Sequence, residues 1–318
     1  MTNAKPNPHA ADEPTLVQRG AVRLACYDSG ARDDLRPTLV FVHGYPDTHR
    51  VWDRMVAPLS ETFRCVRYDV RGAGQSSRPR ATAAYALDEL EADLAAVIDW
   101  ASPSRPVHLI AHDWGSIQSW EAVTDPALSH RIASFTSISG PCLDHVGHWL
   151  RAQWRDDRAA LMRQLKKSWY VFAFHIPWLP TLAWHGGLAS RWPRTTERLE
   201  GQALPVHPTL ARDGAHGTKL YRANVFARIR RPRLRHAQIP VHVITPVRDA
   251  FVGPGFARDL DRWVDDLTIT PVDAAHWAVL THPQSIADLC ADFIRARPAP
   301  DVAAPEARPN TVSPRPSA

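Results

Sequence analysis

Two short apolar runs with a helical pattern between them limit what this chain can fold into. Residues 38–42 (TLVFV) and 107–111 (VHLIA) are nearly continuous apolar segments, as expected for strands buried on both faces of a parallel sheet. The apolar residues between them that recur at helical spacing are Leu87, Leu90, Leu94, Val97 and Ile98. Because parallel strands are joined by such crossovers, the pattern predicts an α/β fold with a mostly parallel central sheet flanked by helices.

The strand-like pattern stops near residue 142 and resumes near residue 237. The segment between, 143–236, is helix-like and rich in Arg and Trp, whereas 241–245 (VHVIT) and 267–270 (LTIT) again resemble buried strands. We therefore expect a core in two parts, 16–142 and 237–296, with a helical cap over 143–236. The two ends, 1–15 and 297–318, lack periodicity and are expected to be disordered.

Composition excludes several classes of protein. Hydrophobic residues make up 44% and charged residues 22% of the 318, which is typical of a globular chain and not of a fibre. No apolar run reaches the ~18 residues of a membrane span. The first residues also lack the apolar region of a secretory signal, so we expect a soluble, cytoplasmic protein. The four cysteines are too far apart in sequence to indicate a zinc site or a disulfide framework.

A run of arginines accounts for much of the formal charge of +5. The run consists of Arg228, Arg230, Arg231, Arg233 and Arg235. Nucleic-acid platforms usually interleave aromatic residues with such cations, and none occurs here. The run is therefore interpreted as a solvated linker face, and no nucleic-acid partner is expected.

The segment 109–116 (LIAHDWGS) places a short strand directly before a helix, with Asp113 at the turn. A strained turn that exposes a nucleophile needs small residues two positions before and after it, and Ala111 and Gly115 supply them. A carboxylate in that place attacks a saturated carbon and forms an alkyl ester that water can hydrolyse. The simpler interpretation of Asp113 is a cap for the following helix.

Two further strand ends carry partners for such a nucleophile. The turn His43-Gly44-Tyr45-Pro46 follows the first buried strand, and its Tyr45 N–H, with that of Trp114, would form an oxyanion hole. His276 follows the last predicted strand and is the expected base that activates water.

An acidic residue is needed to orient that histidine, and Asp249 follows the preceding strand. The chain order of nucleophile, acid and histidine supports this choice. Asp266 and Asp273 remain possible substitutes for Asp249.

Four separated motifs together resemble the α/β-hydrolase family, and within it the epoxide hydrolase branch. They are HGYP from His43, DVRGAGQSS from Asp69, HDWG from His112 and HW at His276. With the spacing of Asp249, the resemblance covers about residues 16–296. The stretches SISGP, SWYVFAFHIPWLP and LYRAN are similar to the hydrolase portion of actinobacterial proteins fused to a short-chain reductase. No glycine-rich dinucleotide fingerprint occurs here, so no nicotinamide cofactor is implied, and neither another cofactor nor a metal is expected.

The resemblance implies a small hydrophobic epoxide and water as the reactants. In epoxide hydrolases two cap tyrosines protonate the oxygen of the opening ring, and Tyr170 and Tyr221 match those positions. The simpler interpretation of Tyr170 is an aromatic residue that packs in a Trp-rich helix. Half of the twelve tryptophans lie in 149–192, which suggests an apolar lining for the substrate site. The expected substrate contacts are Trp114, Trp169 and Trp277.

Three alternatives stay open or are disfavoured on the sequence. A haloalkane dehalogenase would use the same aspartate, with a cap indole as the halide's second donor, although Tyr45 stands where many dehalogenases have Asn. A non-catalytic receptor is disfavoured because every catalytic position holds a suitable residue. A serine esterase is disfavoured because Ser116 lies three residues beyond the turn. The oligomeric state is left open.

Overall fold

The computed structural model describes residues 13–30 and 35–297. Within them, eight strands form one sheet in the order β1-β2-β4-β3-β5-β6-β7-β8. The strands are β1 (Thr15–Arg19), β2 (Val22–Asp28), β3 (Thr38–Val42), β4 (Arg64–Tyr68), β5 (Val107–His112), β6 (Ile132–Ile138), β7 (Val241–Pro246) and β8 (Leu267–Val272). β1, β2 and β4 pair antiparallel, and all pairs from β4 to β8 are parallel. The predicted mostly parallel sheet is confirmed.

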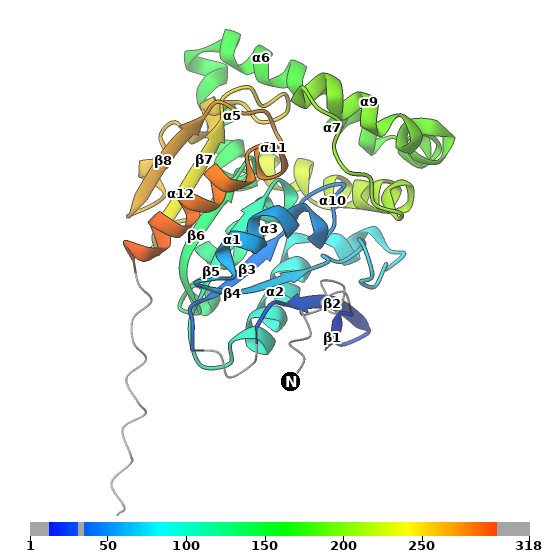
Figure 1. Cartoon of the computed structure of the whole chain (residues 1–318). Helices are drawn as coiled ribbons and strands as arrows, with labels where there is room; N and C mark the ends of the chain where they lie inside the picture. Colours follow the sequence, from blue (N-terminus) through cyan, green and yellow to red (C-terminus); the bar gives the residue numbers. More distant parts are fainter. Residues whose placement is uncertain (1–12, 31–34, 298–318) are drawn as a thin grey trace, which may run out of the picture.

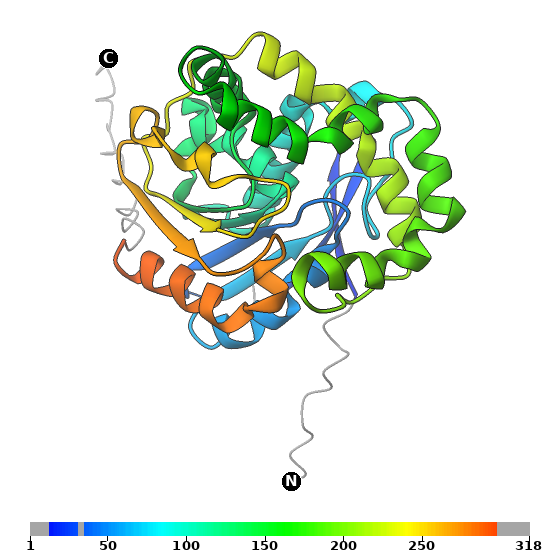
Figure 2. The same ribbon diagram turned by 90° about the horizontal axis from the view of Figure 1, so that it is seen from above.

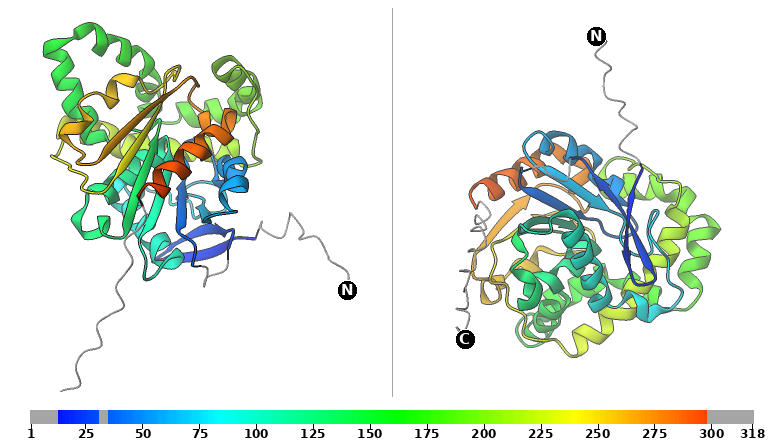
Figure 3. Two further views of the ribbon diagram at one scale, coloured as in Figure 1. Left: turned by 60° about the vertical axis from the view of Figure 1, so that its left-hand side comes forward. Right: turned by 90° about the horizontal axis from the view of Figure 1, so that it is seen from below.

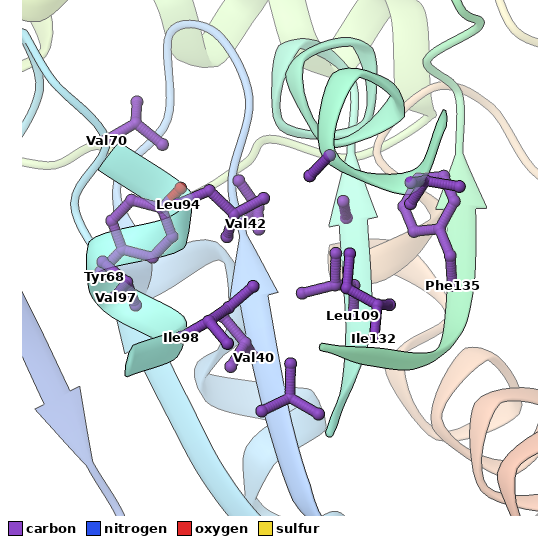
Figure 4. Packing of buried hydrophobic residues seen from close by; sticks show 14 of the residues in the cluster. Val40, Val42, Tyr68, Val70, Leu94, Val97, Ile98, Leu109, Ile132 and Phe135 are labelled. Atoms are coloured by element: carbon purple, nitrogen blue, oxygen red, sulfur yellow. The ribbon is translucent and has the colours of Figure 1, made fainter. Parts of the chain in front are cut away.

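Helices cover both faces of this sheet (Figures 1 and 2). One face is packed by α1 (Asp53–Leu59), α11 (Ala278–Thr281) and α12 (Pro283–Arg295), and the other by α2 (Leu87–Ala101), α3 (Trp114–Thr124) and α4 (Pro126–Ser129). Strand side chains alternate between the faces, so Val40 and Val42 meet Leu94 and Ile98 of α2 in Figure 4. The neighbouring Leu39 and Phe41 point to the opposite face of the sheet and belong to the apolar cluster that includes residues of α1, α11 and α12.

The predicted cap segment contains the helices α5 to α10. They are α5 (Leu143–Asp156), α6 (Arg158–Lys167), α7 (Trp169–His175), α8 (Leu179–Ala183), the short turn η3 (Trp184–Leu188), α9 (Ala189–Glu200) and α10 (Leu210–Arg230). Figures 1 and 3 show these helices beyond the carboxyl ends of the parallel strands, where the loops that follow β3, β5, β7 and β8 meet. The expected disordered ends fall almost entirely outside the described residues.

Most of the arginine run is not the solvated face that the sequence suggested. Arg233 lies 2.7 Å from Glu121 Oε2 on α3 and 2.8 Å from Asp144 Oδ2 on α5, and both carboxylates are buried. Arg235 also pairs with Glu121, and Arg228 lies 3.6 Å from it. The interpretation was wrong for these three residues because their partners lie far away in the sequence. The end of the cap is therefore tied to the core by ion pairs around two buried acids.

Glu121→Ala is expected to lower the free energy of unfolding by about 3 kcal/mol, because removing one partner of a buried ion pair leaves the remaining charge without compensation. Urea denaturation measures this. The matched control is Asp99→Ala, which breaks the pair of Arg131 with the exposed Asp99. The control variant should lose less than ~1 kcal/mol. Equal losses in both variants would contradict the structural role assigned to Glu121.

Among the described residues, none of the helices combines the length and apolar character needed to cross a bilayer. The four cysteines, Cys26, Cys65, Cys142 and Cys290, are buried free thiols.

Candidate active site

Asp113 lies in the turn between β5 and α3 with φ 51° and ψ −124°, a conformation that L residues rarely adopt. The turn is crowded: a Cβ added to Gly115 would lie 2.0 Å from the carbonyl oxygen of Val42. Glycine is therefore required two residues after Asp113. The Asp113 side chain makes no capping hydrogen bond to α3, so the simpler role of a helix cap is not what the structure shows.

The loop after β3 approaches the Asp113 carboxylate from one side. The backbone N–H of Tyr45 donates to Asp113 Oδ1 at 2.7 Å. Gly44 allows this approach, because a Cβ there would lie 2.5 Å from the same oxygen. Trp114 is the first residue of α3, where backbone N–H groups have no partner within the helix. One carboxylate oxygen is thus held by a backbone donor.

The Tyr45 side chain points away from the carboxylate and into the cap. Its hydroxyl donates to the Gly214 carbonyl at 2.8 Å and accepts from Trp184 Nε1 at 2.7 Å. Burial raises the pKa of this phenol well above its ordinary value. One residue therefore connects the Asp113 carboxylate with two elements of the cap.

His276 lies between two carboxylates. Its Nδ1 is 2.8 Å from Asp249 Oδ2, and its Nε2 is 3.5 Å from Asp113 Oδ2. The other oxygen of Asp249 accepts from the backbone N–H groups of Phe251 and Val252 at 2.7 and 2.9 Å. The acid that faces the histidine is thereby fixed in orientation.

The two other acids considered for this position lie elsewhere. Asp266 pairs with Arg297 at 2.8 Å. Asp273 pairs with Arg248 at 2.8 Å, and its side chain is exposed. The structure brings only Asp249 of these three acids to His276.

The charges around His276 set its protonation. Burial alone lowers the pKa of the imidazole, but the Asp249 charge and the hydrogen bonds to Asp113 and Asp249 raise it well above its ordinary value. Burial likewise works to raise the pKa of Asp249, and His276 with the two backbone donors holds it below its ordinary value. The raised pKa favours the protonated imidazole between these two carboxylates.

Two cap tyrosines line the same cavity as Asp113. Tyr170 of α7 and Tyr221 of α10 have ring centroids 5.9 Å apart, with the rings nearly perpendicular. The pKa of each phenol is raised, first by burial and also by the Asp113 charge. Both phenols are therefore neutral at ordinary pH and retain a proton to donate.

Asp113 and both tyrosines line one cavity of about 130 Å³. Most of its wall is apolar, and α5, α6 and α10 contribute Leu143, Val146, Leu150, Leu165, Val225 and Ile229 to it. Gln164 also lines it, but its amide is occupied: it donates to the Phe251 carbonyl and to Ser168 Oγ, and accepts from the Gly253 N–H. Of the described residues in its wall, Asp113 is the only acidic or basic one.

The expected substrate contacts of two tryptophans need correction. Trp114 lines the cavity, but the side chain of Trp169 is 68% exposed and does not. Trp169 is the first residue of α7, and the three residues that follow it, Tyr170, Val171 and Phe172, are the ones that line the cavity. Trp277 is also absent from the wall; it packs against His276 with ring centroids 4.7 Å apart.

Two acids that the sequence did not predict accept hydrogen bonds from Trp277. The indole Nε1–H donates to Asp47 Oδ2 at 2.9 Å, and the backbone N–H of Trp277 donates to Glu200 Oε2 at 3.2 Å. Burial raises the pKa of Asp47 to about 7, with a further contribution from the Asp113 charge. The position of Asp47 directly after HGYP was a usable signal, whereas nothing in the sequence points to Glu200.

The sheet order, the turn that carries Asp113 and the acid–histidine pair define an α/β hydrolase. The chain belongs to the alpha/beta hydrolase fold family, whose family model matches residues 37–283, and the predicted fold is confirmed.

Among curated proteins, the probable oxidoreductase EphD of Mycobacterium tuberculosis is 39% identical over 284 residues, which are 86% of this chain and 48% of that protein. Epoxide hydrolase A of the same species is 30% identical over 192 residues, covering 60% of this chain and 55% of the relative. The chain thus spans about half the length of these two relatives. The predicted resemblance to epoxide hydrolases is confirmed.

A solved structure of similar fold is a Bacillus megaterium epoxide hydrolase mutant in complex with its diol product. Its TM-score is 0.73 at 20% identity, with 88% of this chain and all of that chain covered. At that identity the likeness supports the fold alone.

Proposed function

We propose that this chain hydrolyses an apolar epoxide to a vicinal diol through an ester on Asp113. The observation that carries this proposal is a pair of neutral tyrosines, the half-buried Tyr170 and the buried Tyr221, in the same cavity as Asp113. An epoxide that opens leaves an alkoxide on the carbon skeleton, and that oxygen needs a proton donor. The name of one relative, epoxide hydrolase A, supports the same reaction, whereas EphD is named a probable oxidoreductase.

In the first step, Asp113 Oδ2 attacks a ring carbon, and the C–O bond of the epoxide breaks. The electron pair moves to the ring oxygen, which takes a proton from Tyr170 or Tyr221. The Tyr45 N–H holds Oδ1 at 2.7 Å, so the attacking oxygen is the one on the His276 side. The product of this step is a hydroxyalkyl ester of Asp113.

Ester formation also changes the charge on His276. Esterified Asp113 is neutral, so one of the two groups that raise the pKa of His276 is removed, and the pKa falls. The proton on Nε2 can then be returned toward the tyrosinate, and the neutral imidazole becomes a base for water. Water gives a proton to His276 and attacks the ester carbonyl, and the Tyr45 and Trp114 N–H groups stabilise the oxyanion. The C–O bond to the substrate then breaks, the departing oxygen takes the proton of His276 to complete the diol, and the acid of Asp113 returns its proton to the imidazole.

The cavity wall supports an apolar substrate. Among the described residues that line the cavity, Asp113 is the only one with a carboxylate, amino, guanidinium or imidazole group, and the amide of Gln164 is satisfied by protein groups. A charged or strongly polar substituent would lose its hydration there without gaining a partner. We therefore propose alkyl or aryl epoxides without a charged group.

A haloalkane dehalogenase needs a second indole N–H donor for the departing halide, and this cavity does not offer one from the cap tryptophans among the described residues. Trp114 lines the cavity, but none of the six cap tryptophans does, in the part of the chain that the structure describes. The indole N–H of Trp184 is already used by the Tyr45 hydroxyl, and Trp154, Trp169 and Trp178 are exposed. The tyrosine pair thus favours the epoxide.

The test compares leaving groups in wild type and in Tyr221→Phe, using styrene oxide and a bromoalkane. We expect wild type to form diol and to release little bromide. Tyr221→Phe should lower diol formation about 10²-fold, because general-acid assistance is worth that order. Phe226→Leu, a change at the cavity wall that removes no hydroxyl, is the matched control. Bromide release that matches diol formation and does not respond to Tyr221→Phe would overturn the proposal.

A further inference from the structure

The outer face of the cap exposes an unusual number of large apolar side chains. We call this set the cap patch; it consists of Met162, Trp169, Phe172, Ile176, Trp178, Leu179 and Leu182. Trp169 and Phe172 are three residues apart on α7, so they share one side of that helix, and Ile176 follows directly after its end. Clustered apolar exposure of this kind marks an interaction surface, because isolated monomers keep such patches small.

The same segment is strongly cationic. Residues 158–194 contain Arg158, Arg163, Lys166, Lys167, Arg191 and Arg194 and no acidic residue. Arg163 lies 3.9 Å from Asp157, and Lys167 Nζ donates to the Asp249 carbonyl at 2.6 Å. The exposed cations that remain are Arg158, Lys166, Arg191 and Arg194. Exposed tryptophan and phenylalanine side chains flanked by lysine and arginine match the chemistry of an anionic lipid surface, whose headgroups attract the cations while its acyl boundary takes up the rings.

The cap patch is continuous with the candidate active site. Phe172 lines the cavity that holds Asp113, and it is 54% exposed on the outer face. Leu165 of α6 and Phe226 of α10 also line that cavity, and Phe226 lies 5.6 Å from Phe172 between ring centroids. Figure 1 shows α6 and α7 on the outer side of the cap, away from the sheet. An apolar molecule that leaves a lipid layer at the cap patch therefore has an apolar route to Asp113.

We propose that the cap patch docks on an anionic lipid bilayer and that the enzyme takes its epoxide directly from that layer. The second half of the proposal rests on the proposed function. A second copy of the chain is a poorer occupant, since in a two-fold contact between two cap patches the exposed cations Arg158, Lys166, Arg191 and Arg194 would repel their counterparts.

Vesicle sedimentation with the full chain tests the docking surface. We expect binding to phosphatidylcholine vesicles that contain phosphatidylglycerol, little binding to phosphatidylcholine alone, and weakening with added salt. Lys166→Gln should lower the partition coefficient about fivefold through the loss of one cation. Trp178→Ala should lower it about tenfold through the loss of buried apolar area.

Matched controls change the same residue types elsewhere. Arg295→Gln removes an exposed cation from α12, and Leu16→Ala removes an exposed apolar side chain from β1. Both should leave vesicle binding unchanged. Equal binding by all four variants, or equal binding to both kinds of vesicle, would overturn the proposal. A concentration-dependent dimer that is lost in Trp178→Ala, without vesicle binding, would assign the cap patch to a second copy instead.

Turnover separates this proposal from the proposed function. A long-chain epoxide carried in the anionic vesicles should be hydrolysed about tenfold more slowly by Trp178→Ala, whereas styrene oxide in buffer should be hydrolysed at the wild-type rate. A chain that bound vesicles and hydrolysed neither epoxide would refute the proposed function and leave the docking surface intact. If Trp178→Ala hydrolysed both the vesicle-borne epoxide and styrene oxide at the wild-type rate, uptake of the substrate from the lipid layer would be refuted.

Discussion

Asp113→Asn is expected to abolish diol formation, with kcat lowered on the order of 10⁵-fold or more, because a neutral amide cannot attack the epoxide carbon. The substitution is isosteric, and the Tyr45 N–H can still donate to the remaining oxygen, so the fold should be kept. Diol release measured by chromatography, with the urea midpoint as a folding check, tests this expectation.

Asp273→Asn serves as the matched control for Asp113→Asn. Asp273 is the acid closest in sequence to His276, but its side chain is exposed and paired with Arg248. The control should keep the wild-type rate. A loss of only tenfold in Asp113→Asn would contradict a covalent route, since direct attack by water needs no carboxylate nucleophile. Asp113→Ala should repeat the loss and thereby exclude recovery by slow deamidation of the asparagine.

His276→Gln is expected to trap the enzyme as the ester. Attack on the epoxide requires Asp113 and the tyrosines, whereas hydrolysis of the ester requires a base, whose loss typically costs 10²- to 10⁴-fold. Mixed with styrene oxide, this variant should gain the mass of one epoxide per chain, seen by intact-protein mass spectrometry. The wild type should show no such adduct at steady state.

The double variant Asp113→Asn with His276→Gln is the control, and it should gain no mass. An adduct that persists in the double variant would place the reaction on another residue. A single turnover in ¹⁸O-labelled water gives a second reading: the first diol should carry unlabelled oxygen from Asp113, and label in that diol would contradict the ester.

The sequence was informative where local chemistry determines the geometry. Asp113 and Gly115 could be placed in one turn because its crowding leaves few residue types possible. The loops after β3, β7 and β8 could be expected to meet because the carboxyl ends of parallel strands share one edge of a sheet. These contacts needed no knowledge of long-range packing.

Other features depend on packing that spacing does not reveal. Ser168 interrupts the helical path between α6 and α7, so the inward side of α7 could not be inferred from α6, and Trp169 was placed in the cavity in error. The partners of Arg233 are Glu121 and Asp144, about a hundred residues earlier in the chain. Such contacts follow from how the cap returns to the core, which local patterns do not encode.

The two ends of Tyr45 have a consequence for engineering. Its N–H holds the Asp113 carboxylate, while its hydroxyl bonds Gly214 and Trp184 in the cap. A chimera that received a foreign cap would lose the two bonds that fix this tyrosine, and the backbone donor would drift from the nucleophile although no core residue had changed. Cap exchange in this chain should therefore retain Gly214 and Trp184, so that a change of substrate specificity does not also lower the rate of the reaction.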